Sequence, residues 1–152
     1  MHKWQILTSI FVLLFVCDEV TAGDKEDVLA SWNAVKAAWM IGDIDAAQKH
    51  ISAEFESFEA DGSLLSPFDF EAAKAAFAAG LKFNVQSAHS EVTIYGDAAI
   101  LTEYHTRQLT PPGGTLVSMT LRATLVFVKQ NGQWKGVHAH ASHLFQKIPS
   151  KS

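Results

Sequence analysis

Two histidines near the C-terminal end of the chain are the residues best suited to chemistry. His138 and His140 are separated by one residue, so on a β-strand both imidazoles project to the same side. Because imidazole titrates near neutral pH, either ring could serve as a general base. His138 and His140 are therefore the candidate catalytic residues, although the sequence places no partner beside them and names no reaction.

The strands that must position these histidines form a hairpin around the turn signal Asn131-Gly132. If the turn is type I with Gly132 left-handed, we expect the facing pairs Arg122/His140, Thr124/His138 and Val126/Gly136. One face would then carry Arg122, Thr124, Val126, Trp134, His138, His140 and Ser142. The other face would be apolar and would also need a cover, with Leu121, Ala123, Leu125, Phe127, Val137, Ala139 and Ala141. A two-residue turn would shift the pairing by one and place Arg122 opposite the histidines' face.

Arg122 beside the two histidines would form a cationic site. A guanidinium group presents fixed donors that match the two oxygens of a carboxylate, so such a site suits an anionic ligand. The alternative is that Arg122 pairs internally with Glu103 or another acid, since a buried arginine needs a partner.

The histidine pair could also bind zinc, with Glu103, His105 or His143 completing the set of ligands. No spacing in the sequence fixes those remaining ligands. Histidines that form the polar wall of a pocket are the favoured interpretation, and we expect no metal and no cofactor.

Isomerase chemistry would require a carboxylate base that faces donors for an enolate oxygen. The strands offer Glu91, Glu103, Tyr95 and Tyr104. Glu103 and Tyr104 are adjacent, so on a regular strand they point to opposite faces and cannot both enter one pocket. This constellation is not visible in the sequence.

The composition indicates one small domain. A chain of 152 residues that is 48% hydrophobic can close a single core. The net charge of −4 is mild and the basic residues are scattered, which argues against a nucleic-acid partner.

The first 22 residues have the pattern of a signal peptide: a basic start, an apolar stretch over residues 4–16 and the small-residue sequence Val20-Thr21-Ala22. We therefore expect an exported protein, periplasmic or secreted, with one domain over residues 23–148 and a frayed tail over 149–152. Cleavage would remove Cys17, the only cysteine, and with it any disulfide or thiol chemistry. An uncleaved anchor and a lipid on Cys17 are the alternatives. The mature form is expected to have no contact with the membrane.

Helical spacing dominates the first half of the mature chain. Apolar residues at steps of four, three and four predict a first helix that ends at Gly42, namely Val28, Trp32, Val35 and Trp39. Asp43 can cap a second helix that carries Ile44, Ala47 and Ile51. The sequence Ser66-Pro67-Phe68-Asp69 predicts the cap and first turn of a third helix with Phe70, Ala73, Phe77 and Leu81.

Strand patterns fill the rest of the chain. Asp61-Gly62 predicts a short hairpin between Phe55/Phe58 and Leu64/Leu65, ahead of the third helix. From Lys82 onward, β-branched and aromatic residues alternate between turn signals and predict four consecutive antiparallel strands. The fold class is α+β.

Several of these segments together resemble the SnoaL-like branch of the nuclear transport factor 2-like superfamily: Trp39-x-x-Gly42-Asp43-x-Asp45, Val92-x-x-Tyr95-Gly96-Asp97-x-Ala99, Arg122-x-Thr124-x-Val126 and Asn131-Gly132-x-Trp134-x-x-Val137-His138-x-His140-x-Ser142. The ending also resembles the association (hub) domain of calcium/calmodulin-dependent protein kinase. The resemblance implies a cone, in which the helices close the concave side of a curved sheet around a pocket and the convex side forms a homodimer.

The resemblance also implies the residues of the pocket. Arg122, His138, His140 and Ser142 match family positions at or near it, Glu103 is a further candidate, and Phe55, Phe58 and Trp39 would form its apolar wall. We expect an exported domain that binds a small organic molecule, with anionic molecules as the candidate class. An acid/base enzyme acting on a small apolar substrate (an isomerase, cyclase or dehydratase) is one alternative, and a dimerisation or assembly module with a vestigial pocket is another.

Overall fold

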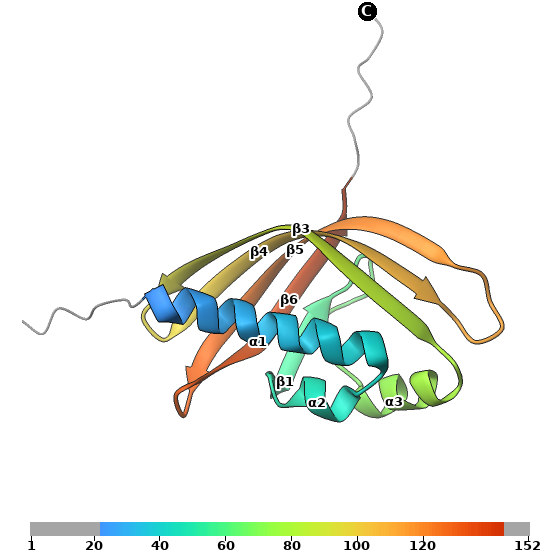
Figure 1. Cartoon of the computed structure of the whole chain (residues 1–152), viewed down its shortest axis with the longest axis horizontal. Coiled ribbons are helices and arrows are strands. Elements are labelled where there is room, and N and C mark those ends of the chain that lie inside the picture. The colour runs from blue at the N-terminus through green and yellow to red at the C-terminus, as the bar shows by residue number, and fades with distance from the viewer. Residues whose placement is uncertain (1–21, 145–152) are drawn as a thin grey trace, which may run out of the picture.

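The computed structural model describes residues 22–144, so residues 1–21 of the expected signal peptide (residues 1–22) and the tail over residues 149–152 lie outside this range. Three helices lie on one side of a strongly bent sheet (Figure 1). They are α1 (Ala22–Ile41), α2 (Ile44–Gln48) and α3 (Phe70–Ala78). Within the described range, no helix is long and apolar enough to cross a membrane.

The sheet has six strands in the order β2-β1-β6-β5-β4-β3. The four long strands predicted from the sequence are present as β3 (Lys82–Tyr95), β4 (Ala98–Thr110), β5 (Val117–Gln130) and β6 (Gln133–His143), and they pair antiparallel. A short hairpin is present as β1 (Ile51–Phe58) with β2 (Ser66–Pro67), but the predicted second strand at Leu64/Leu65 is wrong, because the pairing begins only at Ser66. The sequence did not show that β1 also pairs in parallel with β6, which extends the sheet by two strands.

The helix boundaries follow from local chemistry. Gly42 ends α1 with φ 76°, a left-handed conformation that favours glycine, as expected. Asp43 caps α2, since its side chain accepts a hydrogen bond from Ala46 N at 2.9 Å. The second helix is shorter than predicted, because Ile51 already begins β1.

The start of α3 differs from the prediction. Ser66 and Pro67 do not cap the helix, because they are paired with β1 opposite Ser57 and Glu56. Asp69 is the cap instead, and its carboxylate accepts a hydrogen bond from Ala72 N at 2.9 Å. A backbone engaged in a strand cannot also supply the first turn of a helix.

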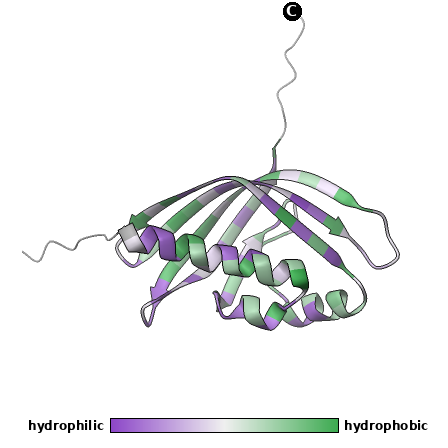
Figure 2. Ribbon diagram, viewed as in Figure 1, coloured by the Kyte–Doolittle hydropathy of each residue, from purple (hydrophilic) through white to green (hydrophobic). Residues whose placement is uncertain are grey.

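The core lies between α1 and the concave face of the sheet. Hydrophobic and hydrophilic residues alternate along the long strands, as expected for strands with two different faces (Figure 2). The apolar residues that meet α1 there include Leu101, Leu125, Phe127 and Trp134, all buried, and Val28 of α1 packs against them.

The turn of the last hairpin has two residues, not three as predicted. Asn131 and Gly132 have φ values of 52° and 77°, which is the pattern of a type I′ turn, and Gln130 pairs with Gln133. The strand pairs predicted above are therefore wrong.

A β-bulge in β6 then shifts the strand pairing by one residue and offsets the effect of the shorter turn on which face each side chain takes. Phe127 pairs with Gly136 but Val126 pairs with His138, so one extra residue, Val137, lies in β6. Beyond the bulge the observed pairs are Arg122/Ser142, Thr124/His140 and Val126/His138. The prediction that Arg122 and the two histidines share a face is thus confirmed. Trp134, which precedes the bulge, lies on the other face and is buried.

Candidate functional site

A cavity of about 230 Å³ lies between the helices and the concave face of the sheet. Its wall is mostly apolar and aromatic, with Trp32, Val35, Trp39, Ile51, Phe55, Phe68, Phe83, Val85, Leu109 and Ala139. Four polar side chains complete the lining: Lys36, Glu59, His105 and Arg107. An apolar hollow with a few convergent polar groups is the usual form of a small-molecule site.

A larger and more open hollow, of about 640 Å³, lies between the end of α1 and α3. Its polar lining includes Lys74, which forms ion pairs with Asp45 and Glu71. Because this lysine is already paired and the hollow is the more open of the two, we place the candidate site in the smaller cavity.

Strand β4 runs from the closed end of the cavity to its mouth. Glu103, His105 and Arg107 alternate onto the same face of this strand. The exposed fraction of their side chains rises from 0% through 3% to 26% along the strand. Glu103 is therefore the deepest of the three groups, and Arg107 lies nearest to solvent.

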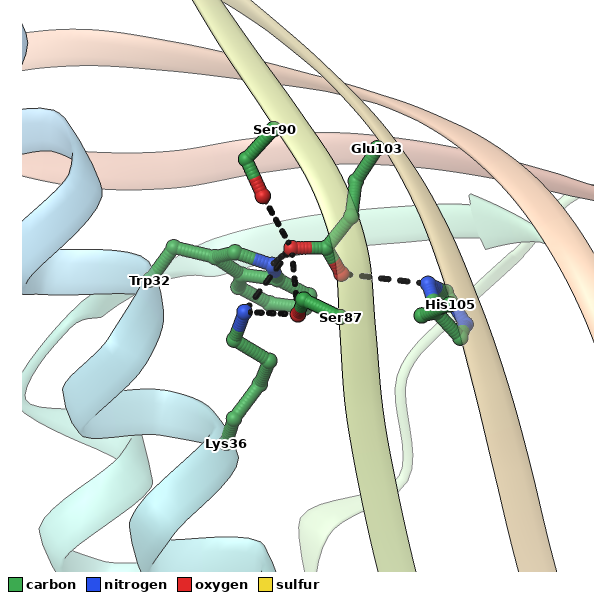
Figure 3. A network of polar contacts seen from close by, with 6 residues as sticks. All are labelled: Trp32, Lys36, Ser87, Ser90, Glu103 and His105. Carbon is green, nitrogen blue, oxygen red and sulfur yellow. Dashed lines mark hydrogen bonds and ion pairs between the residues drawn. The ribbon is translucent and has the colours of Figure 1, made fainter.

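Glu103 is the centre of a buried polar network that joins α1, β3 and β4 (Figure 3). Its Oε2 atom accepts hydrogen bonds from Lys36 Nζ at 2.8 Å, Trp32 Nε1 at 3.2 Å, and the hydroxyls of Ser87 and Ser90 at 2.8 Å each. Lys36 also donates to Ser87 Oγ at 2.6 Å. The network stabilises a charge that could not otherwise be buried.

The network sets the charge of Glu103. Burial raises the pKa of this carboxyl group and is the largest single effect, but the contacts with His105, Lys36 and Ser87 together outweigh it and lower the pKa to about 2. Glu103 is therefore ionised at neutral pH. It can orient a neighbouring polar group, but it is too weak a base to take up a proton there.

His105 is that neighbour, and it faces the cavity. Its Nδ1 atom lies 3.1 Å from Glu103 Oε1, on the side of the carboxylate away from Lys36 (Figure 3). This contact does not have hydrogen-bond geometry, and neither ring nitrogen has a hydrogen-bond partner within residues 22–144. Nδ1 is nevertheless engaged by the close contact with Glu103, so Nε2 is the buried polar atom that has no contact with a polar group among the described residues.

Arg107 and Glu59 form an ion pair at the mouth. Arg107 Nη1 donates to Glu59 Oε2 at 3.2 Å, and Ser57 Oγ donates to Glu59 Oε1 at 3.0 Å. Arg107 Nε is buried and has no partner in the described part of the chain. Two cationic groups, Lys36 and Arg107, thus reach the cavity, and each is held by one carboxylate.

The four residues predicted from the last hairpin lie elsewhere: Arg122, His138, His140 and Ser142 are on the convex face of the sheet. Arg122 and His140 are exposed, and Arg122 Nε donates to Ser142 Oγ at 2.9 Å. Among the described residues, the cavity lining includes none of the four. The expectation that they line the pocket is therefore wrong, because the helices cover the other, apolar face of the hairpin. The internal pairing of Arg122 with Glu103 is wrong for the same reason.

The two histidines form an aromatic cluster with Phe58, also on the convex side. The ring centres of His138 and His140 lie 5.9 and 5.8 Å from that of Phe58. Phe58 is 41% exposed and does not form part of the cavity wall, contrary to expectation. Trp39 and Phe55 do lie on that wall, and Glu103 lies behind His105.

The zinc site considered above cannot form as suggested. Glu103 and His105 lie on the concave face, whereas His138 and His140 lie on the convex face. Over residues 22–144, no three histidine, cysteine, aspartate or glutamate side chains are grouped closely enough to hold a metal ion.

Sequence reasoning missed His105, Arg107 and Lys36 as cavity residues. The alternation of side chains along β4 could have indicated two of them, because His105 and Arg107 lie on the same face of the strand as Ala99 and Leu101, which are buried. Nothing in the sequence brings Lys36 next to Glu103, since that contact joins a helix to a strand 67 residues away.

Comparison with known proteins adds a family and a fold. The sequence profile of the SnoaL-like domain matches residues 26–146. A search of the curated proteins finds no match.

Three solved structures illustrate the fold similarity. A proposed calcium/calmodulin-dependent kinase II association domain from Exiguobacterium sibiricum has 17% identity and a TM-score of 0.71, covering 85% of this chain and 98% of its own. A proposed dehydratase of the NTF2-like family from Streptomyces avermitilis has 19% identity and a TM-score of 0.68, covering 80% and 97%. A proposed aromatic ring hydroxylase from Novosphingobium aromaticivorans has 17% identity and a TM-score of 0.69, covering 82% and 91%.

Proposed function

We propose that this chain, which belongs to the SnoaL-like domain family and has the nuclear transport factor 2-like fold, binds a small, largely apolar organic molecule in the cavity between its helices and sheet. The family and fold suggested by the sequence motifs are thereby confirmed. The cavity of about 230 Å³ is smaller than the roughly 300–1,000 Å³ typical of drug-sized ligands, so the ligand is small.

One observation carries this proposal: His105 is buried on an apolar wall, its Nδ1 lies against the Glu103 carboxylate, and its Nε2 has no hydrogen-bond partner within the described residues. An unsatisfied buried polar group costs free energy, on the order of 1–3 kcal/mol. A ligand that hydrogen-bonds to His105 would recover this energy. The surrounding aromatic rings would supply the apolar contact.

Native mass spectrometry of the protein purified from its own host tests the proposal directly. We expect a bound small molecule in the wild-type protein and its loss in Ala139→Leu, which fills the cavity. Ala37→Leu, on the exposed side of α1, is the matched control and retains the ligand. Equal ligand occupancy in a folded Ala139→Leu protein would refute binding in this cavity.

The contact between His105 and Glu103 supports a second candidate function, acid/base catalysis. An ionised carboxylate beside Nδ1 orients the imidazole, and Nε2 would then exchange a proton with the substrate. The similar structures from Streptomyces and Novosphingobium are named as proposed enzymes. In this proposal the general base is His105 and not His138 or His140, because of these three histidines only His105 lines the cavity.

Once a ligand is identified, the variant His105→Gln distinguishes an enzyme from a protein that only binds. If the protein is an enzyme, this variant still binds the ligand but no longer converts it, and the pH dependence of the conversion is lost. For a binding protein, the ligand is recovered unchanged from wild type and variant alike.

Export and dimerisation are also part of the proposal. The pattern of the first 22 residues supports export, and the mass of the protein in the periplasm or culture medium tests it, since cleavage predicts a chain that begins at Gly23.

The similarity to a proposed association domain supports self-association through the sheet. An assembly role without a ligand would be indicated by stable oligomers and the absence of any co-purified molecule.

A further inference from the structure

The ion pair between Glu59 and Arg107 spans the concave side of the sheet. Glu59 follows β1 and Arg107 lies on β4, and two strands, β6 and β5, separate them in the sheet. In a flat sheet, three strand spacings of about 4.8 Å would keep β1 and β4 roughly 14 Å apart. The bend of the sheet brings these two lining residues into contact, and both are partly exposed, so the pair lies on the solvent side of the cavity.

Arg107 is incompletely satisfied by this contact. Glu59 accepts from Nη1 only, at 3.2 Å, and its other oxygen is held by Ser57. The buried Nε of Arg107 has no partner within residues 22–144. A guanidinium group can give two parallel hydrogen bonds to one carboxylate, and Glu59 does not use this geometry.

The charges at the cavity balance in pairs. Lys36 neutralises Glu103 at the closed end, and Glu59 neutralises Arg107 at the mouth. A ligand with one carboxylate that replaced Glu59 would keep this balance, and it could use the free Nε–H as well. Glu59 is 40% exposed in its side chain, so it can turn into water at little cost in solvation.

We propose that Glu59 is an internal competitor for Arg107, and that the ligand is a small apolar monocarboxylate whose acid group displaces it. This inference rests on the proposed binding function and specifies its ligand class and its regulation. The cavity of about 230 Å³ is small and mostly apolar, which suits an acid the size of benzoate.

Trp32 and Trp39 line the cavity, so binding can be followed by tryptophan fluorescence. Benzoate and its neutral analogue benzamide are each titrated into four proteins: wild type, Glu59→Gln, Arg107→Lys and Glu54→Gln. The last variant is the control, because the side chain of Glu54 is exposed and is not part of the cavity lining. We expect Glu59→Gln to raise the affinity for benzoate roughly fivefold, the factor that corresponds to loss of one partly exposed ion pair. Benzamide affinity and the Glu54→Gln control change less than twofold.

Arg107→Lys retains the positive charge but removes the two-donor geometry. We expect it to weaken benzoate binding and leave benzamide binding unchanged. If benzamide binds but Glu59→Gln leaves the affinity for benzoate as in wild type, the competitor role is refuted while binding in the cavity stands. If neither probe binds to any folded variant, the inference and the proposed function both fail.

Discussion

Lys36 of α1 and Glu103 of β4 form a buried ion pair, with Nζ and Oε2 2.8 Å apart. This pair fixes the helix over the concave face of the sheet and places a negative charge directly behind His105. The same two residues therefore support the fold and the electrostatics of the candidate site.

The first prediction concerns acid unfolding. The pKa of Glu103 in the folded protein is about 2, below the ordinary value of 4.5. The ionised form stabilises the fold, so its contribution is fully present above pH 4.5 and is lost as the pH falls from about 4.5 to 2. A difference of this size corresponds to roughly 3 kcal/mol. Denaturant unfolding of wild type and Glu103→Gln across this range should show a loss in wild type that the variant lacks.

The second prediction concerns the same pair at neutral pH. Glu103→Gln leaves Lys36 buried without a counter-charge and should lower the free energy of unfolding by about 3–5 kcal/mol. The double variant Lys36→Met/Glu103→Leu removes both charges and should recover most of that loss. Chemical denaturation measures both values. A double variant no more stable than the single one would show that the pair itself stabilises the fold.

Local patterns predicted much of the fold. Residues at helical spacing, the glycine after α1 and the aspartate before α2 all indicated elements that the structure contains. The start of α3 was wrong, because Ser66 and Pro67 satisfy helix-cap preferences and are nevertheless held in a strand by β1. Tertiary pairing overrides local preference there.

The site was less accessible to prediction. Alternation showed that Arg122, His138 and His140 share a face, but not which face the helices cover. The bulge at Val137 also has no clear sequence signal, and it determines that Trp134 is buried whereas the histidines lie on the convex side. Which face is inside depends on where α1 packs, and that information is distributed over the whole core.

The third prediction concerns the turn between α1 and α2. Gly42 has φ 76°, and a Cβ atom there would lie 3.0 Å from the Phe77 ring of α3. Gly42→Ala should therefore destabilise the protein by about 2 kcal/mol or more, from backbone strain and crowding together. Gly62→Ala is the matched control, because Gly62 has φ 82° but no neighbour within 4 Å. Thermal unfolding of both variants separates the two causes, and equal losses would mean that Phe77 moves aside freely.

The last prediction concerns the convex face of the sheet, which the described helices leave uncovered (Figure 1). Tyr104 and Ile100 lie there with 46% and 37% exposure, and large exposed side chains grouped on one face are typical of an interface. If this face forms the proposed dimer, Tyr104→Glu places a charge in the contact and should shift the protein toward monomer in light scattering at several concentrations. Leu64→Glu, in the loop before β2 with an exposure of 88%, is the control outside this face and should leave the dimer intact. A wild-type protein that is monomeric at every concentration would contradict the dimer, and a dimer that survives Tyr104→Glu would place its interface elsewhere.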